Sequence, residues 1–319
     1  MNRGAAVISI DTERIWGYFD FIGEQQFEAR YPNARATHHR LLELLSREGI
    51  GATWAVVGAL SLAGSEGGSD PRMRGVPPYW AECIPAGNER TRPLWYAGSF
   101  IRGIQDARTP QEIGLHGGIS HLVWGDARTS APLAARELQA GIAALNEIGV
   151  DPVSFVFPRD LEAHHEVLAE GGIRCYRGRA PILSERLGFN VAGSLARAAE
   201  EVCGATPPVV WPEEVLPGLW NLPASMFLYC LGRNRSRLVR PSLRVERTTL
   251  GLQAAAKSRG VFHLGLHPEN LAESDFAFSV FESMIHEICR WRDMDDIEIL
   301  TMSEAVNRVS MESKELATA

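Results

Sequence analysis

A pair of histidines and a pair of carboxylates are the residues of this sequence most suited to chemistry. His116 and His121 flank a glycine-rich loop that follows the strand-like segment 112–116. Two neutral imidazoles this close can converge on one divalent ion, and Gly117 and Gly118 tolerate the backbone angles that the bend requires. The alternative is that the two histidines only stabilise local turns.

Asp11 and Glu13 come directly after a short apolar run at residues 5–10, which is typical of a buried parallel strand. Side chains alternate along a strand, so the two carboxylates should point the same way. Two carboxylates together are costly unless a cation or a shared proton relieves their repulsion. Alternatively, Asp11 caps a turn and Glu13 faces solvent.

Two further strand-like segments end in residues that could take part in catalysis. Residues 154–157 lead into Pro158 and Arg159, and residues 261–266 lead into His267. An arginine beside carboxylates can orient a catalytic acid or base through two parallel hydrogen bonds. The alternative is that Arg159 forms only a surface salt bridge. His267 falls where parallel α/β barrels gather their active sites, and His263 shares a strand face with it.

The segments that must position these residues alternate between strand-like and helix-like patterns, which predicts a parallel α/β sheet or barrel. Helices are expected at 37–48, 131–148, 161–170, 243–259 and 275–292, and strands at 5–10, 52–58, 112–116, 154–157, 172–177, 219–225, 261–267 and 297–300. We find no internal repeat and no boundary of a second core. We therefore expect one domain over residues 1–319, with an inserted loop at about 61–93 that could form a lid.

The composition argues against several classes of protein. The chain has 319 residues, of which 45% are hydrophobic and 22% charged, and its net charge is −7. This balance disfavours binding to nucleic acid or to an anionic membrane surface. No apolar run approaches the roughly 20 residues of a membrane span. The charge at Asp11 follows too soon for a signal peptide, and the five scattered cysteines fit reduced thiols. We therefore predict a cytoplasmic protein.

The order of these motifs resembles that of the polysaccharide deacetylase family, the carbohydrate esterases with NodB homology. The similar segments, which span about residues 6–305, are Ile8–Asp11, Ala52–Gly58, Glu112–His121, Phe157–Arg159 and Leu266–His267. The resemblance implies a distorted or incomplete (β/α) barrel. Thr12 stands where the family usually has a second aspartate, and the two loop histidines are five residues apart instead of four. The arginine motif also differs, so a divergent branch concerned with glycan or amino-sugar biosynthesis is indicated.

The resemblance implies a hydrolase that cleaves a linear amide C–N bond and removes an N-acetyl or N-formyl group from an amino sugar. His116, His121 and one carboxylate, Asp11 or Glu13, would hold a divalent metal ion, with Zn²⁺ favoured. The other carboxylate would act as the base that takes a proton from water.

The remaining roles also follow from the resemblance and from position in the chain. Arg159 would orient the base, and His267 would protonate the leaving amine. Trp16, Trp124 and His263 are the side chains that we expect to contact the sugar.

Two other functions fit the same sequence. One is a metal-independent amidohydrolase on the same fold, similar to the allantoinase-like branch. The other is a catalytically inactive carbohydrate-binding protein, in which the aromatic-rich stretch 16–31 would form the binding wall. The arginine cluster at 233–247 could contact a phosphate or a uronate on the ligand, or could be a solvated face.

Overall fold

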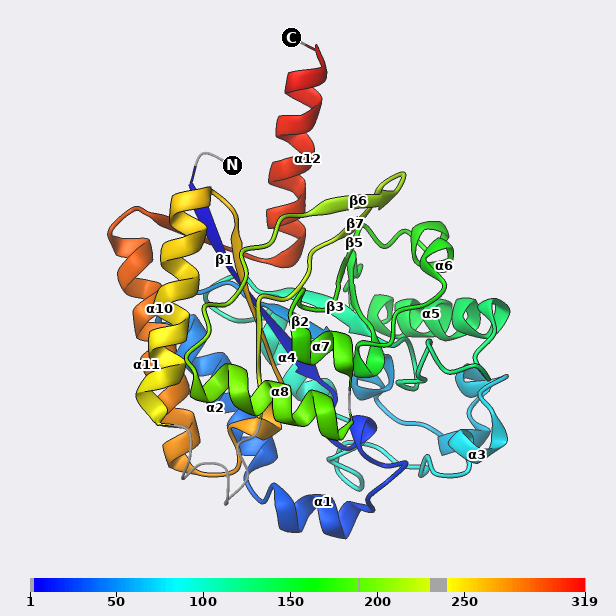
Figure 1. Cartoon of the computed structure of the whole chain (residues 1–319). Coiled ribbons are helices and arrows are strands. Elements are labelled where there is room, and N and C mark those ends of the chain that lie inside the picture. The colour runs from blue at the N-terminus through cyan, green and yellow to red at the C-terminus, as the bar shows by residue number, and fades with distance from the viewer. Residues whose placement is uncertain (1–2, 189, 230–239, 319) are drawn as a thin grey trace.

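The computed structural model describes residues 3–188, 190–229 and 240–318 (Figure 1). Its strands are β1 Gly4–Thr12, β2 Thr53–Val56, β3 Glu112–His116, β4 Ser154–Val156, β5 Cys175–Arg177, β6 Glu213–Leu216, β7 Leu219–Asn221, β8 Met226–Leu228, β9 Val261–Leu266 and β10 Ile297–Leu300.

The α-helices are α1 Glu24–Arg30, α2 Ala34–Arg47, α3 Pro78–Ala81, α4 Gly98–Gln105, α5 Ala131–Asn146, α6 His165–Glu170, α7 Leu183–Leu187, α8 Val191–Val202, α10 Pro241–Ser258, α11 Asp275–Asp293 and α12 Met302–Thr318. Short 3₁₀ helices are η1 Arg14–Gly17, η2 Gly58–Ser61, η3 Gly67–Ser69, η4 Pro71–Met73, η5 Pro158–Asp160 and η6 Pro268–Asn270.

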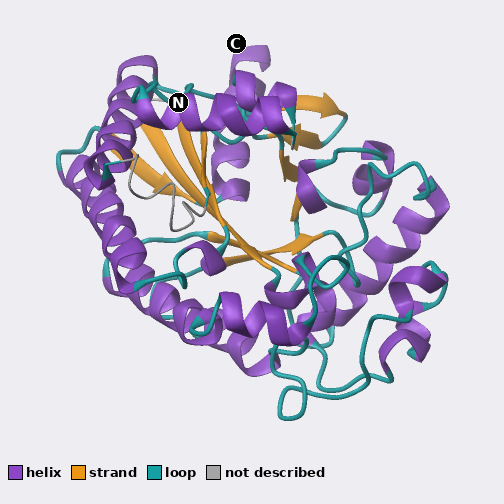
Figure 2. Cartoon of the chain, turned by 60° about the horizontal axis from the view of Figure 1, so that its bottom comes forward, coloured by secondary structure: helices purple, strands orange, loops and turns teal. Residues whose placement is uncertain are grey.

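The strands form one curled sheet in the order β6-β7-β5-β4-β3-β2-β1-β9-β8, with β10 added beside β1. The β6–β7 pair is antiparallel, and the other pairs of named strands are parallel. The path ends at β6 and β8, so the barrel is not closed. Figure 2 shows helices around the outside of the curled sheet. The structure therefore confirms the predicted distorted, incomplete (β/α) barrel.

Strand β1 is the central element of this sheet, because it pairs with β2, β9 and β10. All nine of its residues are buried, as its unbroken apolar run predicts. Burying a side chain such as Ile8 or Ile10 stabilises the fold by about 1.5–3 kcal/mol. At its start, Gly4 lies against α10, where an added Cβ would come within 2.6 Å of the carbonyl carbon of Ala255. A larger residue there would push the strand and the helix apart.

Helices cover the convex side of the sheet. Figure 1 shows α10 and α11 side by side and α12 projecting from the body of the molecule with the C-terminus. Helix α11 begins at a cap formed by Ser274, whose side chain accepts a hydrogen bond from the backbone N–H of Ala277. Helix α5 buries an apolar face that also contains one carboxylate, Glu137. That acid becomes important at the site.

The segment at 61–93, expected as an inserted loop, contains η3, η4 and α3 between irregular stretches. Trp80 in α3 is buried, and its indole N–H donates to the carbonyl oxygen of Ser120 at 2.9 Å. The segment thus packs on the loop that carries the two histidines. Its action as a lid stays a prediction.

Two expectations from composition concern membranes and thiols. In the described part of the chain, no helix is both long enough and apolar enough to cross a membrane. Cys83, Cys175, Cys203 and Cys289 are free thiols, and Cys230 lies outside the described residues.

Candidate active site

The site is built where the parallel strands end. Asp11 is the penultimate residue of β1, His116 and Arg177 are the last residues of β3 and β5, and His267 follows β9 directly. Because parallel strands present their carboxyl ends at one edge of the sheet, four separated segments converge there. Glu13 comes immediately after β1 and reaches the same place.

Glu13, His116 and His121 form a compact, buried group that could hold a metal ion, with one ligand atom from each within 4.8 Å of the others. The two imidazole Nε2 atoms lie 3.1 Å apart. Oε2 of Glu13 lies 3.0 Å from Nε2 of His116 and 2.9 Å from Nε2 of His121. Nδ1 of His116 faces the carbonyl oxygen of Val156 at 3.0 Å, so it carries the proton and leaves Nε2 for a ligand bond.

The loop between the histidines bends as its glycines predict. Gly117 and Gly118 have φ angles of 78° and 100°, and His121 itself has a φ of 59°. A Cβ on Gly118 would lie 2.6 Å from the carbonyl oxygen of Glu137, so only glycine fits between the loop and α5. The indole N–H of Trp124 donates to the carbonyl oxygen of Gly117 at 3.0 Å and fixes the bend from the other side.

Glu137 holds the same loop from within α5. Its carboxylate accepts hydrogen bonds from the backbone N–H and the hydroxyl of Ser120, at 2.9 Å and 2.8 Å. Burial raises the pKa of Glu137 to about 7, although these two hydrogen bonds oppose the shift. Because Ser120 precedes His121, this buried acid fixes the position of one candidate metal ligand.

Asp11 lies beside the trio but is held by a different partner. Both of its carboxylate oxygens accept hydrogen bonds from Arg177, at 2.6 Å and 2.8 Å, and both side chains are buried. Burial alone would raise the pKa of Asp11, but the positive charge of Arg177, the hydrogen bonds from His267 and Arg177 and the charge of His116 together hold that pKa well below its usual range. Asp11 is therefore ionised and oriented at neutral pH.

A chain of hydrogen bonds supports Arg177 from behind. Its Nη1 donates to the hydroxyl of Ser9 at 3.0 Å, and that hydroxyl lies 2.9 Å from Nε2 of His263. Nδ1 of His263 faces the carbonyl oxygen of Pro223 at 3.0 Å and carries the proton, so Nε2 accepts from Ser9. Burial lowers the pKa of His263 to about 3, so its ring stays neutral.

His267 faces both carboxylates. Its Nε2 lies 3.3 Å from Oδ2 of Asp11 and 3.4 Å from Oε1 of Glu13. Burial alone would lower the pKa of His267, but the negative charges of Glu13 and Asp11 raise it to about 9. Its imidazole is therefore protonated at neutral pH and can donate a proton to a group bound in front of it.

Arg159, expected to orient the base, lies elsewhere. It is 37% exposed, and its Nη2 pairs with Asp20 at 2.6 Å and 2.7 Å. Arg177 contacts Asp11 in its place. The structure thus places Arg177, at the end of β5, in the contact with Asp11 that was expected of Arg159, and it groups Glu13, not Asp11, with the two histidines.

The three side chains expected to contact the sugar are all in the interior. Trp16, Trp124 and His263 are fully buried. The indole N–H of Trp16 donates to the carbonyl oxygen of Trp95 at 2.9 Å, and the other two residues support the loop and Arg177 as described above. None of the three offers an exposed surface to a substrate, which corrects that expectation.

Sequence reasoning did not identify Arg177 or Glu137, although both left a signal. Arg177 is a charged residue at the end of the strand predicted at 172–177, which is the criterion that singled out Arg159. Glu137 lies on the apolar face of the helix predicted at 131–148, and an acid there is rarely buried without a specific partner.

The fold is that of the NodB-type polysaccharide deacetylases. A crystal structure described as "putative polysaccharide deacetylase from Mycobacterium smegmatis" matches with a TM-score of 0.63 at 20% identity, over 98% of this chain and 92% of that one. The "probable Polysaccharide deacetylase from Pseudomonas aeruginosa PAO1" matches with a TM-score of 0.61 at 10% identity, over 95% and 89%.

A third solved structure of the same fold is Puue allantoinase, which matches with a TM-score of 0.60 at 11% identity, over 95% of this chain and 89% of that one. No family model and no curated protein sequence matches this chain. At these levels of identity the likeness establishes the fold, and the chemistry has to be argued from the site.

Proposed function

We propose that this protein is a metal-dependent hydrolase that removes an N-acyl group, acetyl or formyl, from an amino sugar. The observation that carries the proposal is the convergence of Glu13, His116 and His121 on one point. Beside that point lie an oriented carboxylate, Asp11, and a protonated imidazole, His267.

The donor set suits a divalent cation of the Zn²⁺ type. Two imidazole nitrogens and one carboxylate oxygen are the three protein ligands of many catalytic zinc sites, which keep a further position open. The two Nε2 atoms lie 3.1 Å apart, and each also contacts Oε2 of Glu13. Only one of the two nitrogens can donate a proton to the other. A cation would satisfy all three atoms at once. When bound here, such an ion would polarise the amide carbonyl and lower the pKa of water.

Asp11 supplies the base in this proposal. Arg177 keeps it ionised and fixes its orientation, so its free lone pairs can accept a proton from the attacking water. Asp11 is not part of the candidate ligand trio, which separates the ligand role from the base role. Of the two carboxylates that the sequence left open, the proposal takes Glu13 as the ligand and Asp11 as the base.

His267 supplies the acid. It stands 3.3 Å from Asp11 and carries a proton at neutral pH, so it can donate that proton to the amine nitrogen as the C–N bond breaks. The acyl group leaves as a carboxylic acid. The amine product leaves on the side of His267.

The amino-sugar substrate is supported by two observations. Two of the matching solved structures carry the description polysaccharide deacetylase. A pocket with polar and aromatic walls also opens beside His267. A metal-independent amidohydrolase is the second candidate, because Puue allantoinase shares the fold at nearly the same TM-score.

One experiment separates the two candidates. The purified protein is analysed for bound metal and assayed for release of acetate or formate from N-acetyl and N-formyl amino sugars, before and after treatment with a chelator. We expect about one metal ion per chain and activity that is lost with the chelator and restored by Zn²⁺. Full hydrolysis of an amide in metal-free protein would refute the proposed function and support the second candidate.

A further inference from the structure

The arginine cluster at 233–247, which could contact an anionic ligand or face solvent, ends inside the molecule. Three of its members lie outside the described residues: Arg233, Arg235 and Arg237. Arg244 and Arg247, which both belong to α10, are only 8% and 6% exposed. A buried arginine needs a negative partner, because taking its charge out of water is costly. The partners of these two arginines therefore indicate what this end of the cluster does.

Arg244 is compensated within the protein and Arg247 is not. Nη2 of Arg244 lies 3.1 Å from Oε1 of Glu201 and donates to the carbonyl oxygen of Tyr229 at 2.7 Å. Arg247 forms no ion pair with an acidic side chain in the described part of the chain, and its one hydrogen bond there joins Nε to the carbonyl oxygen of Ala205 at 2.9 Å. Burial lowers the pKa of Arg247, as expected for a guanidinium whose charge the fold compensates incompletely.

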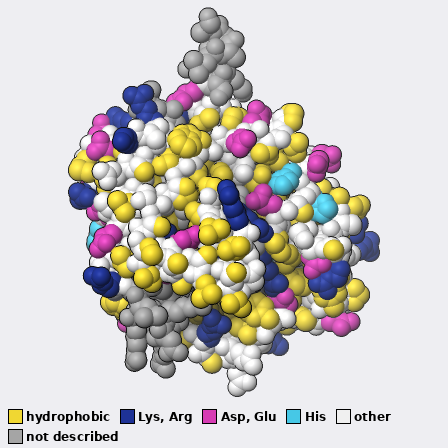
Figure 3. Space-filling model, in the orientation of Figure 1, with side chains coloured by type: hydrophobic (Ala, Val, Ile, Leu, Met, Phe, Trp, Pro, Cys, Tyr) yellow, Lys and Arg dark blue, Asp and Glu magenta, His cyan; other side chains and the backbone are white. Residues whose placement is uncertain are grey.

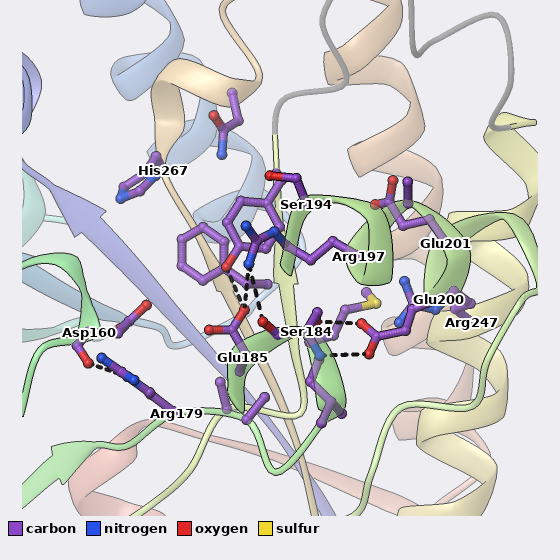
Figure 4. A pocket seen from close by; sticks show the side chains of 18 of the residues that line it. Asp160, Arg179, Ser184, Glu185, Ser194, Arg197, Glu200, Glu201, Arg247 and His267 are labelled. Atoms are coloured by element: carbon purple, nitrogen blue, oxygen red, sulfur yellow. Dashed lines mark hydrogen bonds and ion pairs between the residues drawn. The ribbon is translucent and has the colours of Figure 1, made fainter. Parts of the chain in front are cut away.

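Two acids near Arg247 are already held by other donors. The charges of Glu201 and Glu200 act on Arg247 and oppose the effect of its burial. Glu201 pairs with Arg244, as described above. Glu200 accepts hydrogen bonds from the backbone N–H and the hydroxyl of Ser184 at 3.1 Å and 2.6 Å, which Figure 4 shows as dashed lines. Neither acid can close on Arg247 without giving up a donor, so a ligand is the remaining source of a negative partner.

Arg247 lines a pocket of about 320 Å³ that also reaches His267, and this volume is within the range of small-molecule sites. Figure 4 shows His267 at one end of the pocket, Arg247 at the other and Arg197 between them. His267 is the proposed donor to the leaving amine. The pocket therefore lies on the side of the reaction centre that receives the amine-bearing part of the substrate, and not the acyl group.

Positive charge exceeds negative charge along this pocket. Five arginines and four acidic residues line it. The five are Arg30, Arg177, Arg179, Arg197 and Arg247. Like Arg247, the half-buried Arg179 forms no ion pair with an acidic side chain among the described residues, and its Nε donates to the carbonyl oxygen of Asp160 at 2.5 Å. An anion bound here would offset this surplus, whereas a neutral ligand would displace water and leave the charges uncompensated.

The outer side of α8 is apolar, so its arginine does not serve to keep that surface hydrated. Val191 and Leu195 are 77% and 67% exposed, and Figure 3 shows hydrophobic side chains over this part of the surface. The side chain of Arg197 is only 15% exposed and lies 4.0 Å from Glu185, toward which Figure 4 shows it pointing. A surface helix ordinarily turns its charged residues to water. Here α8 contributes its arginine to the wall of the pocket.

We propose that this pocket binds an oxyanion, a phosphate or a carboxylate, on the amine-bearing part of the substrate, with Arg247 as the residue that receives it. A guanidinium can bind two oxygens of such a group at once, and the two Nη atoms of Arg247 have no hydrogen-bond partner among the described residues. The inference rests on the proposed function, because the role of His267 decides which part of the substrate enters the pocket. It goes beyond that function by assigning the substrate a negative charge.

Calorimetric titration of the metal-loaded protein with inorganic phosphate tests the site without a substrate. We expect Arg247→Gln to bind phosphate at least about tenfold more weakly than the unmodified protein, the effect of losing hydrogen bonds from a charged group. Arg247→Lys keeps the charge without the two-point contact and should fall between the two. Phosphate bound at the metal would respond to neither change, because Arg247 is not part of the candidate ligand trio.

Kinetics with three probes identify the anion: N-acetylglucosamine, N-acetylglucosamine 1-phosphate and N-acetylglucosaminuronic acid. We expect kcat/KM for acetate release to be at least about tenfold higher for one of the charged probes than for the neutral sugar. The probe that gains distinguishes a phosphate from a carboxylate. Arg247→Gln should abolish that gain by raising KM for the charged probe, and should leave kcat/KM for the neutral sugar within a few-fold.

A matched control separates the pocket from the net charge of the protein. Arg240→Gln removes an exposed arginine of the same cluster and should behave as the unmodified protein in both measurements. Circular dichroism and thermal unfolding establish that each variant is folded. If Arg247→Gln does not fold, Arg247→Lys takes its place, with a smaller loss expected in the same direction.

The outcomes separate this inference from the proposed function. Acetate release with no preference for either charged probe, or a preference that Arg247→Gln retains, would overturn the inference and leave the proposed function standing. If no probe is hydrolysed, the proposed function fails, and the phosphate titration alone decides the anion site. Weaker binding by Arg247→Gln then supports the site, and equal binding by the two proteins, or no binding by the unmodified one, overturns it.

Discussion

Arg177 holds Asp11 through two hydrogen bonds, Nη1 to Oδ1 at 2.6 Å and Nη2 to Oδ2 at 2.8 Å. Both side chains are buried, and each has one further charged neighbour: Asp160 lies 3.3 Å from Arg177, and His267 lies 3.3 Å from Asp11. The planar guanidinium fits both carboxylate oxygens at once, which a lysine cannot do. The pair therefore fixes the direction of the Asp11 lone pairs as well as its charge.

The first prediction concerns this geometry. Arg177→Lys keeps the positive charge and removes the two-point contact, so Asp11 should remain ionised but lose its orientation. We expect kcat/KM for acyl release to fall about 100-fold, the size of effect that a misplaced catalytic group produces. Metal content should be unchanged, because Arg177 does not contact the candidate ligand trio. Unaltered activity in Arg177→Lys would show that the two-point contact with Arg177 is not needed to position the base.

The second prediction distinguishes the two arginines. Arg159 is 37% exposed and pairs with Asp20, 25% exposed, near the surface. Exposed pairs of this kind contribute about 0–1 kcal/mol to stability. Arg159→Ala should therefore lower the free energy of unfolding by no more than about 1 kcal/mol and leave kcat within a few-fold of the unmodified protein. Urea denaturation and steady-state kinetics measure both quantities, and a loss as large as that of Arg177→Lys would restore Arg159 as the orienting residue.

The third prediction separates the roles of the two carboxylates. Glu13→Gln removes a candidate ligand and should reduce bound metal far below one ion per chain, as should His116→Ala. Asp11→Asn should retain the metal but lose about 100- to 10,000-fold in kcat, because the base is gone. The metal content and the kcat of each purified variant are measured together to assign the two roles. Metal lost in Asp11→Asn and kept in Glu13→Gln would reverse the assignment.

The sequence predicted the parts of this site that depend on position along the chain. Asp11, His116 and His267 could be placed because each follows an apolar run that reads as a strand, and parallel strands end at one edge. It did not reveal which partner each side chain takes. Arg159 and Arg177 both stand at strand ends, and only the register of β4 and β5 in the curled sheet decides which one reaches Asp11.

Burial was the second property that the sequence could not supply. Trp16, Trp124 and His263 stand close to site residues in the chain, yet each points into the core, where its polar atom bonds to a neighbour. Hydrophobic patterning gives the face of a strand or helix. Whether a side chain on that face lines a cavity or packs in the core depends on which other segments of the chain pack against it. Helices α7 and α8 depart from the usual pattern, because Leu183, Val191 and Leu195 are exposed while Ser184 and Glu185 are buried.

The fourth prediction concerns Glu137, whose carboxyl group holds the histidine loop. Its pKa rises from an ordinary 4.5 to about 7 in the folded protein because the group is buried. The folded state therefore favours the protonated form. That contribution is fully present below pH 4.5 and is lost as the pH rises from 4.5 to about 7. By linkage, the loss amounts to about 3 kcal/mol in the free energy of unfolding.

Glu137→Gln tests this directly, because the amide has no charge to desolvate and its oxygen can still accept from the backbone N–H of Ser120. In urea denaturation of metal-free protein, Glu137→Gln should gain stability relative to the unmodified protein between pH 5 and pH 8. Glu166→Gln, an exposed acid on α6, should show no such gain. Parallel pH profiles for the unmodified protein and Glu137→Gln would mean that the buried carboxylate titrates normally, and that Ser120 and the surrounding backbone stabilise its charge fully.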